Sequence, residues 1–231
     1  MNNNRIITRI GEEGRIIDGV SYKNVKVVSF EHHHYIVSDK AILTAVVTPS
    51  CNSNCHFCSN HITFTPTGQF LEWNKKLSRL IDFCKIAKIP KVAFTGGEPT
   101  LQPKRLVSLA GKVAPHFERV RIHTNGYNLL TPVELDSYDG TLLEALGDIG
   151  LNGVSISVSH WNKDINNHIM RNGEWVGLTD DDIVAIVELC REKNITVRLS
   201  CVMTEDGVKN TQDILSFIEW GNNLGVRCFI F

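Results

Sequence analysis

Three cysteines, Cys51, Cys55 and Cys58, lie close together in the sequence Cys-Asn-Ser-Asn-Cys-His-Phe-Cys. This C-x3-C-x2-C spacing places three thiolates on one short loop. In a fully protein-ligated four-iron cluster, each iron is held by a protein thiolate. If the loop holds such a cluster, its three thiolates leave one iron open, which can bind a second molecule.

A glycine pair followed by an acid lies further along the chain, in the sequence Phe-Thr-Gly-Gly-Glu-Pro-Thr at 94–100. It comes at the end of an apolar run, as expected for a turn that follows a buried strand. Together with the cysteine loop, this segment resembles the radical S-adenosylmethionine (SAM) enzymes. In that family the open iron binds the amino and carboxylate groups of SAM. The resemblance runs from about Ala41 to the end of the chain.

The resemblance implies two cofactors, a [4Fe–4S] cluster and SAM. An electron delivered to the sulfonium releases methionine and a 5'-deoxyadenosyl radical, which abstracts hydrogen from an unreactive carbon. We expect a small-molecule or peptide substrate, and a low-potential electron donor such as a flavodoxin or a ferredoxin. The protein positions SAM and substrate and excludes water and oxygen, because the cofactors carry the difficult chemistry. No catalytic side chain is assigned.

The family also implies which residues contact SAM. Gly96, Gly97 and Glu98 correspond to the segment that binds the methionine amino group, where an acid or carbonyl suits an ammonium. Phe57 matches the aromatic residue beside the adenine, and Ser157 matches a fourth-strand serine that meets the SAM carboxylate. Four weaker candidates for the same cofactor site are Thr124, Asn125, Arg198 and Val202. A salt bridge or a solvated strand face explains Arg198 equally well, and core packing explains Val202 nearly as well.

Within the superfamily, the sequence is closest in pattern to the GTP cyclases of molybdenum-cofactor synthesis. The segments 156–171 and 197–202 follow that pattern, although Ser159 stands where those enzymes usually have an acid. The chain also ends before the region that supplies their second cluster and their GTP contacts. We therefore carry over the SAM chemistry and not the GTP substrate.

Two other interpretations remain open. His61 follows Cys58 by three residues, so the cysteines and His61 could form a Cys3His zinc site in a binding module. That reading leaves the glycine-acid turn without a purpose. A glycyl-radical-enzyme activase is the second enzyme reading, but the residues before the cysteines and the cyclase-like strands fit it poorly.

Alternating strands and helices predict the architecture. Helices between the strands favour right-handed crossovers and a parallel sheet. The expected fold is α/β, a partial (βα)6 TIM-like barrel of the radical SAM type with a small N-terminal β extension. The predicted strands are 41–47, 91–95, 119–123, 154–158, 195–202 and 226–231. Helices are predicted around 77–84, after Pro103, from an N-cap at Thr179 with Asp182 at its capping-box position, and over 211–220. Since working residues gather at the carboxyl ends of such strands, the motifs should form one site.

Two regions are expected along the chain, a β hairpin or meander at 1–40 and the radical SAM core at 41–231. The core ends inside or at the close of its last strand, which suggests a lost carboxyl-terminal segment or a partner over the barrel mouth. Three consecutive histidines at 32–34 point to alternating faces of a strand, so we expect surface or edge positions.

Composition narrows the function classes. The chain has 231 residues and a formal net charge of −1, which gives no general electrostatic reason to expect nucleic acid or an anionic membrane as partner. No apolar stretch is long enough to cross a bilayer, so a cytoplasmic protein is expected. The seven cysteines are an odd number, which argues against a complete disulfide framework. The four outside the loop are expected to be buried thiols: Cys84, Cys190, Cys201 and Cys228.

Overall fold

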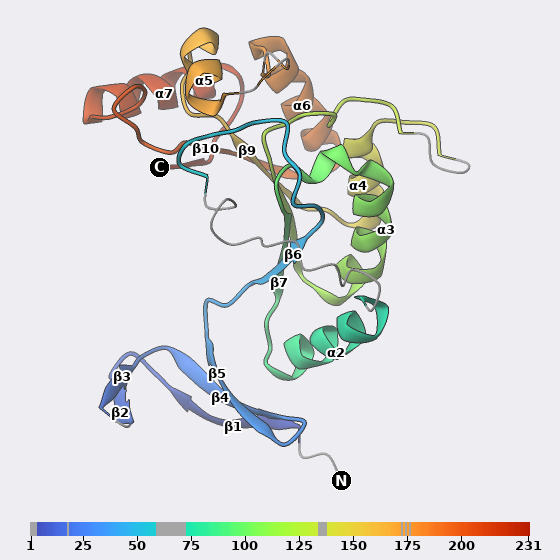
Figure 1. Ribbon diagram of the computed structural model, residues 1–231, viewed down its shortest axis with the longest axis vertical. Helices are drawn as coiled ribbons and strands as arrows, with labels where there is room; N and C mark the ends of the chain where they lie inside the picture. The colour runs from blue at the N-terminus through green and yellow to red at the C-terminus, as the bar shows by residue number, and fades with distance from the viewer. Residues whose placement is uncertain are drawn as a thin grey trace. The chain divides into compact units, whose positions relative to one another are not determined.

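A computed structural model describes residues 4–17, 19–58, 73–133, 138–171, 173, 175 and 177–231. The chain divides into two compact units, each with its own contacts. The first comprises 1–43, 67–92 and 116–118, and the second comprises 44–66, 93–115 and 119–231. Figure 1 shows the elements of both units.

The first unit confirms the N-terminal β extension. Strands β1 (Arg5–Ile10), β4 (Val25–Phe30) and β5 (His33–Ser38) form an antiparallel sheet, and β2 (Arg15–Ile17) pairs with β3 (Val20–Tyr22). Helix α2 (Trp73–Ile86) belongs to this unit by its contacts. Val28 and Val37 of the sheet are buried together with Ala87, which directly follows α2. The predicted domain boundary after residue 40 remains a prediction.

The second unit is built on a six-stranded sheet. Its strand order is β11-β10-β9-β8-β7-β6, and the strands from β8 to β11 pair in parallel. The strand bounds are β6 (Leu43–Val46), β7 (Lys91–Thr95), β8 (Arg119–Thr124), β9 (Gly153–Ser157), β10 (Thr196–Ser200) and β11 (Phe229–Ile230). Each strand overlaps its predicted range, so the predicted α/β architecture is confirmed.

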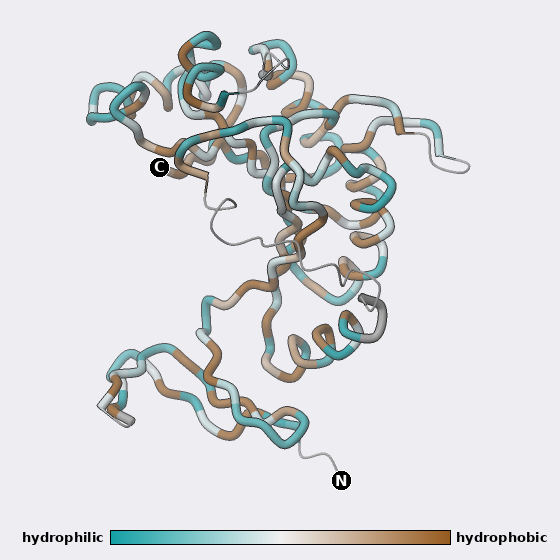
Figure 2. The backbone as a smooth tube through the Cα atoms, in the orientation of Figure 1, coloured by the Kyte–Doolittle hydropathy of each residue, from teal (hydrophilic) through white to brown (hydrophobic). Residues whose placement is uncertain are grey.

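Helices between the strands bury one face each. They are α3 (Pro103–Val113), α4 (Leu142–Ile149), α5 (Lys163–Met170), α6 (Asp180–Glu192) and α7 (Thr211–Asn223). In α3, for example, Leu106, Ala110 and Val113 recur at helical spacing and are buried. Hydrophobic and hydrophilic positions accordingly alternate along these helices in Figure 2. None of the described helices has the length and hydrophobicity that a bilayer crossing requires.

The helix start predicted at Thr179 is confirmed. Its hydroxyl accepts a hydrogen bond from the Asp182 backbone, and the Asp182 carboxylate accepts one from the Thr179 backbone, so both halves of a capping box are present. The predicted burial of Cys84, Cys190 and Cys201 is also confirmed, with exposed fractions of 2%, 0% and 2%. Cys228 is only half-buried.

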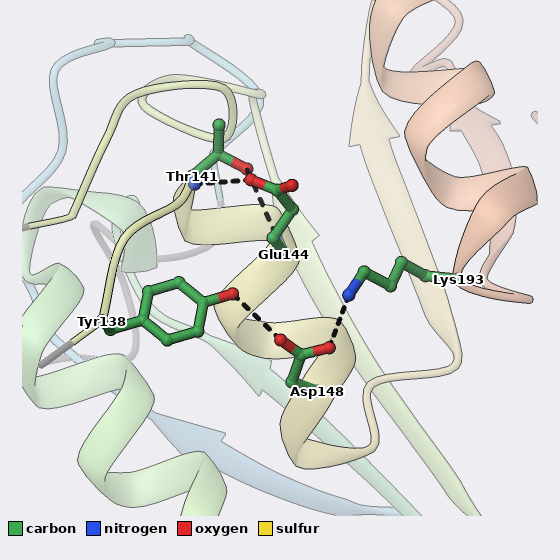
Figure 3. A network of polar contacts seen from close by, with 5 residues as sticks. All are labelled: Tyr138, Thr141, Glu144, Asp148 and Lys193. Atoms are coloured by element: carbon green, nitrogen blue, oxygen red, sulfur yellow. Dashed lines mark hydrogen bonds and ion pairs between the residues drawn. The ribbon is translucent and has the colours of Figure 1, made fainter.

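Helix α4 was not predicted, and its first turn explains why it begins where it does. The Thr141 hydroxyl accepts from the Glu144 backbone at 3.3 Å, and the Glu144 carboxylate accepts from the Thr141 backbone at 2.7 Å (Figure 3). One turn further on, Asp148 accepts from the Tyr138 hydroxyl at 3.0 Å and pairs with Lys193, which follows α6, at 2.6 Å. The two carboxylates therefore hold both ends of α4.

Replacing Thr141 by alanine is expected to lower the stability by about 1 kcal/mol, because it removes the N-cap acceptor. For a chain of this size, that loss corresponds to a Tm about 2–4 °C lower. Differential scanning fluorimetry measures it. Ser108→Ala, at an exposed position inside α3, is the matched control and should not lower the Tm. A Thr141→Ala protein as stable as this control would contradict the cap.

Candidate cofactor site

A cavity of about 280 Å³ lies in the second unit, where β7, β8 and β9 end. Eleven of the predicted site residues line it: Cys51, Cys55, Phe57, Cys58, Gly96, Gly97, Glu98, Thr124, Asn125, Ser157 and Val202. These residues come from segments separated by as much as two-thirds of the chain. The structure therefore brings the cysteine loop and the strand-end motifs to one place.

Arg198 is the predicted residue that does not line this cavity. It lies within β10, and its Nε donates to the Ser155 hydroxyl on β9 at 3.1 Å. Burial lowers the pKa of its guanidinium, and the nearby Arg121 adds to this effect. The geometry thus gives Arg198 a contact between neighbouring strands, outside the set of residues that line the described cavity.

Four cavity residues had no predicted role, namely Ser53, Thr95, His123 and Met170. His123 directly precedes the Thr-Asn-Gly run, so its strand-end position was a usable signal. Burial lowers the pKa of its imidazole, and Arg198 and Arg121 lower it further, which favours the neutral ring. Met170 gave no signal, because it lies at the end of the unpredicted helix α5.

The glycine pair holds the segment that leads into the cysteine loop. The Gly97 backbone donates to the Thr48 carbonyl at 2.8 Å, and the Glu98 backbone donates to the Ser50 carbonyl at 2.8 Å. A Cβ atom at Gly96 would overlap the Thr48 carbonyl oxygen, and one at Gly97 would overlap that of Ser50. Both glycines are therefore required for the close approach of the backbone at 48–50, directly before Cys51.

Gly97→Ala is expected to lower the stability by about 1–3 kcal/mol, the usual range for forcing extra atoms into a packed site. The added methyl group meets backbone atoms, so the segment before Cys51 must shift. Urea unfolding measures the free energy of unfolding. The iron content after anaerobic reconstitution shows whether the cysteine loop still binds the cluster. Gly111→Ala is the control, since a Cβ there meets nothing within 4 Å. Normal stability and iron content in Gly97→Ala would refute this role.

Asn125 connects the end of β8 to the cysteine loop. Its Nδ2 donates to the Asn52 side-chain oxygen at 2.8 Å and to the Ser53 hydroxyl at 3.1 Å. Its Oδ1 accepts from the Tyr127 backbone at 3.0 Å, which fixes the orientation of the amide. Asn125 therefore positions the loop from a second strand end.

Helix α5 provides a third attachment for the loop. The Asn54 backbone donates to the carbonyls of Met170 and Arg171 at 3.3 and 3.1 Å. The Cys55 thiol donates to the Met170 carbonyl at 3.2 Å and lies 3.7 Å from the Met170 sulfur. The position of Cys55 thus depends on a residue far along the sequence.

The Glu98 carboxylate is almost completely buried, with 1% of the residue exposed. It accepts from the Thr100 backbone at 3.0 Å, the Thr100 hydroxyl at 2.8 Å, the Thr124 hydroxyl at 2.7 Å and the Asn125 backbone at 2.7 Å. Burial raises the pKa of Glu98, and these four hydrogen bonds oppose the rise. The carboxylate therefore joins the end of β7 to the end of β8.

The sequence matches the radical SAM superfamily over residues 45–220. That match covers most of the chain and includes every segment that lines the cavity. The chain belongs to the radical SAM superfamily. Members of this superfamily are enzymes that use a [4Fe–4S] cluster and SAM, so the cavity residues should be able to hold both.

Curated relatives of this radical SAM protein are GTP 3',8-cyclases. The protein from Clostridium perfringens is 29% identical over 176 residues, which cover 74% of this chain and 49% of the relative. The protein from Chlorobaculum tepidum is 31% identical, and the match covers 66% of this chain and 50% of the relative. The mitochondrial protein of Arabidopsis thaliana is also 31% identical, and the match covers 75% of this chain and 49% of the relative. The predicted cyclase-like pattern is confirmed, and the chain spans about half the length of these relatives.

Solved structures show the same fold. Streptococcus suis SuiB, bound to its precursor peptide SuiA, has a TM-score of 0.58 at 16% identity and matches 81% of this chain and 38% of SuiB. Native anSMEcpe with bound AdoMet has a TM-score of 0.51 at 18% identity, and the match covers 82% of this chain and 50% of anSMEcpe. The predicted partial barrel is confirmed. The comparisons favour neither the activase nor the zinc module.

The three thiols fit a radical SAM cluster by their chemistry. Burial raises the pKa of Cys51, and burial together with the neighbouring Cys51 and Cys58 raises that of Cys55 to about 11. Such thiols hold their protons until a metal replaces them. Beside them, the Asn52 Nδ2 is one of two buried side-chain atoms in the described residues without a protein partner. An acceptor at the cysteine loop would satisfy it.

The zinc alternative depends partly on His61, which lies outside the described residues. Within the described part of the chain, no three His, Cys, Asp or Glu side chains are placed to hold a single metal ion. A cluster assigns its three cysteines to three different irons, so it does not require them to converge on one point.

Proposed function

We propose that this chain binds a [4Fe–4S] cluster through Cys51, Cys55 and Cys58 and binds SAM in the adjoining cavity. When bound, these cofactors supply one-electron cleavage of a carbon–sulfur bond of SAM, which initiates hydrogen abstraction from a substrate. The substrate is a small molecule or a peptide, and the electron comes from a low-potential donor such as a flavodoxin or a ferredoxin.

One observation carries this proposal. A single cavity is lined by all three cysteines, by the glycine-acid turn and by the ends of β8 and β9. Strand ends of a parallel sheet are where such folds bind their ligands. The family match supports the same reading, since it includes all of these segments.

The residues of the cavity have separate tasks in this proposal. The cysteine thiolates hold the cluster and leave one iron for SAM. The backbone of Gly96 and Gly97 faces the methionine end of SAM, and Ser157 offers a hydroxyl to its carboxylate. Phe57 and Val202 supply apolar surface for the adenine. Thr124 and Asn125 hold Glu98 and the cysteine loop in place.

The substrate of the relatives is not transferred to this chain. GTP 3',8-cyclase activity is named for proteins about twice the matched length, so half of each relative has no counterpart in the alignment. We propose 41–231 as the catalytic region and 1–40 as an appended β region. All seven cysteines are free thiols in the structure, consistent with the cytoplasmic location that we propose.

Anaerobic reconstitution with iron and sulfide tests the proposal. The expected protein is brown, contains four irons per chain and forms 5'-deoxyadenosine from SAM when dithionite is added. Mass spectrometry of the small molecules measures that product. A colourless protein that retains stoichiometric zinc and leaves SAM intact would overturn the proposal in favour of the zinc module.

A further inference from the structure

A second cavity, of about 450 Å³, adjoins the cofactor cavity. Asn125, Ser157 and Met170 line both, so a molecule in the second cavity lies next to the first. Its volume falls within the range of about 300–1,000 Å³ that small-molecule sites occupy. No part of the cofactor proposal uses this space.

Three tryptophan side chains are among the residues that line this cavity. Trp161 follows β9, Trp175 lies between α5 and α6, and Trp220 lies on α7, and all three line the cavity. The chain contains four tryptophans, so most of them gather here from three segments. All three are only partly buried. Tryptophans that merely fill a core would pack against each other and would leave no cavity of this size between the segments.

Each of the three rings is held by a partner. Trp161 stacks on His160 with ring centroids 3.9 Å apart and planes at 26°. Trp175 meets the ring of Tyr127 edge to face at 5.5 Å, and the Trp220 Nε1 donates to Asp180 at 3.1 Å. Because the rings are already ordered, a ligand that stacks on them loses little affinity to their immobilisation.

The polar groups of the cavity favour neither an anionic nor a cationic ligand. One cation, Lys163, and one anion, Asp180, are present in the lining. The His160 Nδ1 accepts from the Asn162 backbone at 2.8 Å, so in the neutral ring the proton is on Nε2. The lining thus combines flat apolar surfaces with hydrogen-bonding groups, which favours a flat, neutral ring with polar substituents.

We propose that this cavity binds a flat aromatic or heteroaromatic ring of the substrate, which reaches the cofactor cavity past Asn125, Ser157 and Met170. Its part in turnover rests on the proposed function, whereas ring binding itself does not. The proposal selects the small-molecule class over an aliphatic peptide side chain.

Fluorine NMR of the full chain labelled with 5-fluorotryptophan tests ring binding. Trp→Phe variants assign the four resonances, and indole-3-acetamide is the probe. We expect saturable shifts at Trp161, Trp175 and Trp220, the three tryptophans that line the cavity. Cyclohexaneacetamide, which has a saturated ring, is the control ligand. No saturable shift, or equal shifts with both ligands, overturns the proposal.

Two substitutions at one position sharpen the test. Trp161→Phe keeps a flat ring and should bind indole-3-acetamide within about threefold of the parent, whereas Trp161→Leu should bind it about tenfold more weakly. Equal affinities in the two variants would exclude stacking on this residue. An unchanged Tm in both confirms that each variant is folded.

The titration is run with and without the reconstituted cluster. Shifts that persist while SAM is not cleaved would refute the proposed function alone. SAM cleavage without ring binding would refute this inference alone.

Discussion

Replacing Cys51, Cys55 or Cys58 by alanine is expected to reduce 5'-deoxyadenosine formation by more than about 100-fold. Replacing a residue that hydrogen-bonds to a metal ligand typically costs about 10–100-fold in metal affinity or activity. The loss of a ligand itself should therefore cost more. The iron content after reconstitution should fall with it, because only three protein thiolates are available in the cavity. Iron analysis and electron paramagnetic resonance of the reduced protein measure this loss.

Cys228→Ala is the matched control for the cysteine variants. It also removes one free thiol, from a half-buried position just before β11 that is not part of the described cavity wall. This variant should retain the cluster and SAM cleavage. A protein without Cys55 that still cleaves SAM at the parent rate under argon would refute the cluster assignment.

Glu98→Gln is expected to lower the free energy of unfolding by about 1–3 kcal/mol, the cost of a buried donor without an acceptor. Each carboxylate oxygen accepts at least one backbone N–H, from Thr100 on one side and Asn125 on the other. Whichever way the amide is turned, its NH2 group faces one of these donors. Glutamine has nearly the same volume as glutamate, so the packing around residue 98 is little changed. Urea unfolding measures the change in the free energy of unfolding.

The matched control for this prediction is Glu219→Gln, an exposed carboxylate on α7. It should leave the unfolding midpoint unchanged. Equilibrium binding of SAM to the reconstituted protein separates the two possible roles of Glu98. If Glu98→Gln weakened SAM binding and left the stability unchanged, the carboxylate would contact the SAM ammonium instead of joining the strand ends.

The strands of the barrel could be predicted from the sequence because they are short apolar runs with clear boundaries. Strand β7 was predicted with its observed bounds, and the helix start at Thr179 was predicted from its capping residues. Helices α4 and α5 were missed. Each has only eight residues, and α5 is mostly polar, so neither gives a sustained helical pattern.

The cofactor residues could be predicted to the extent that their chemistry is local. Cysteine spacing and the glycine-acid turn indicate a cluster and a ligand-binding strand end without knowledge of the fold. The contact of Cys55 with Met170 and that of Asn125 with Asn52 depend on how distant segments of the chain meet. The hydrophobic pattern of the sequence does not predict such contacts. The clash positions at Gly96 and Gly97 likewise appear only when the neighbouring backbone is in place.

The attachments of the cysteine loop have a consequence for the biogenesis of this protein. Cys55 and its partner Met170 are 115 residues apart, so a ribosome must complete most of the chain before the loop acquires its final form. A peptide cut from around the cysteines lacks these supports. We therefore expect the cluster to be inserted only after the barrel has folded around the cysteine loop.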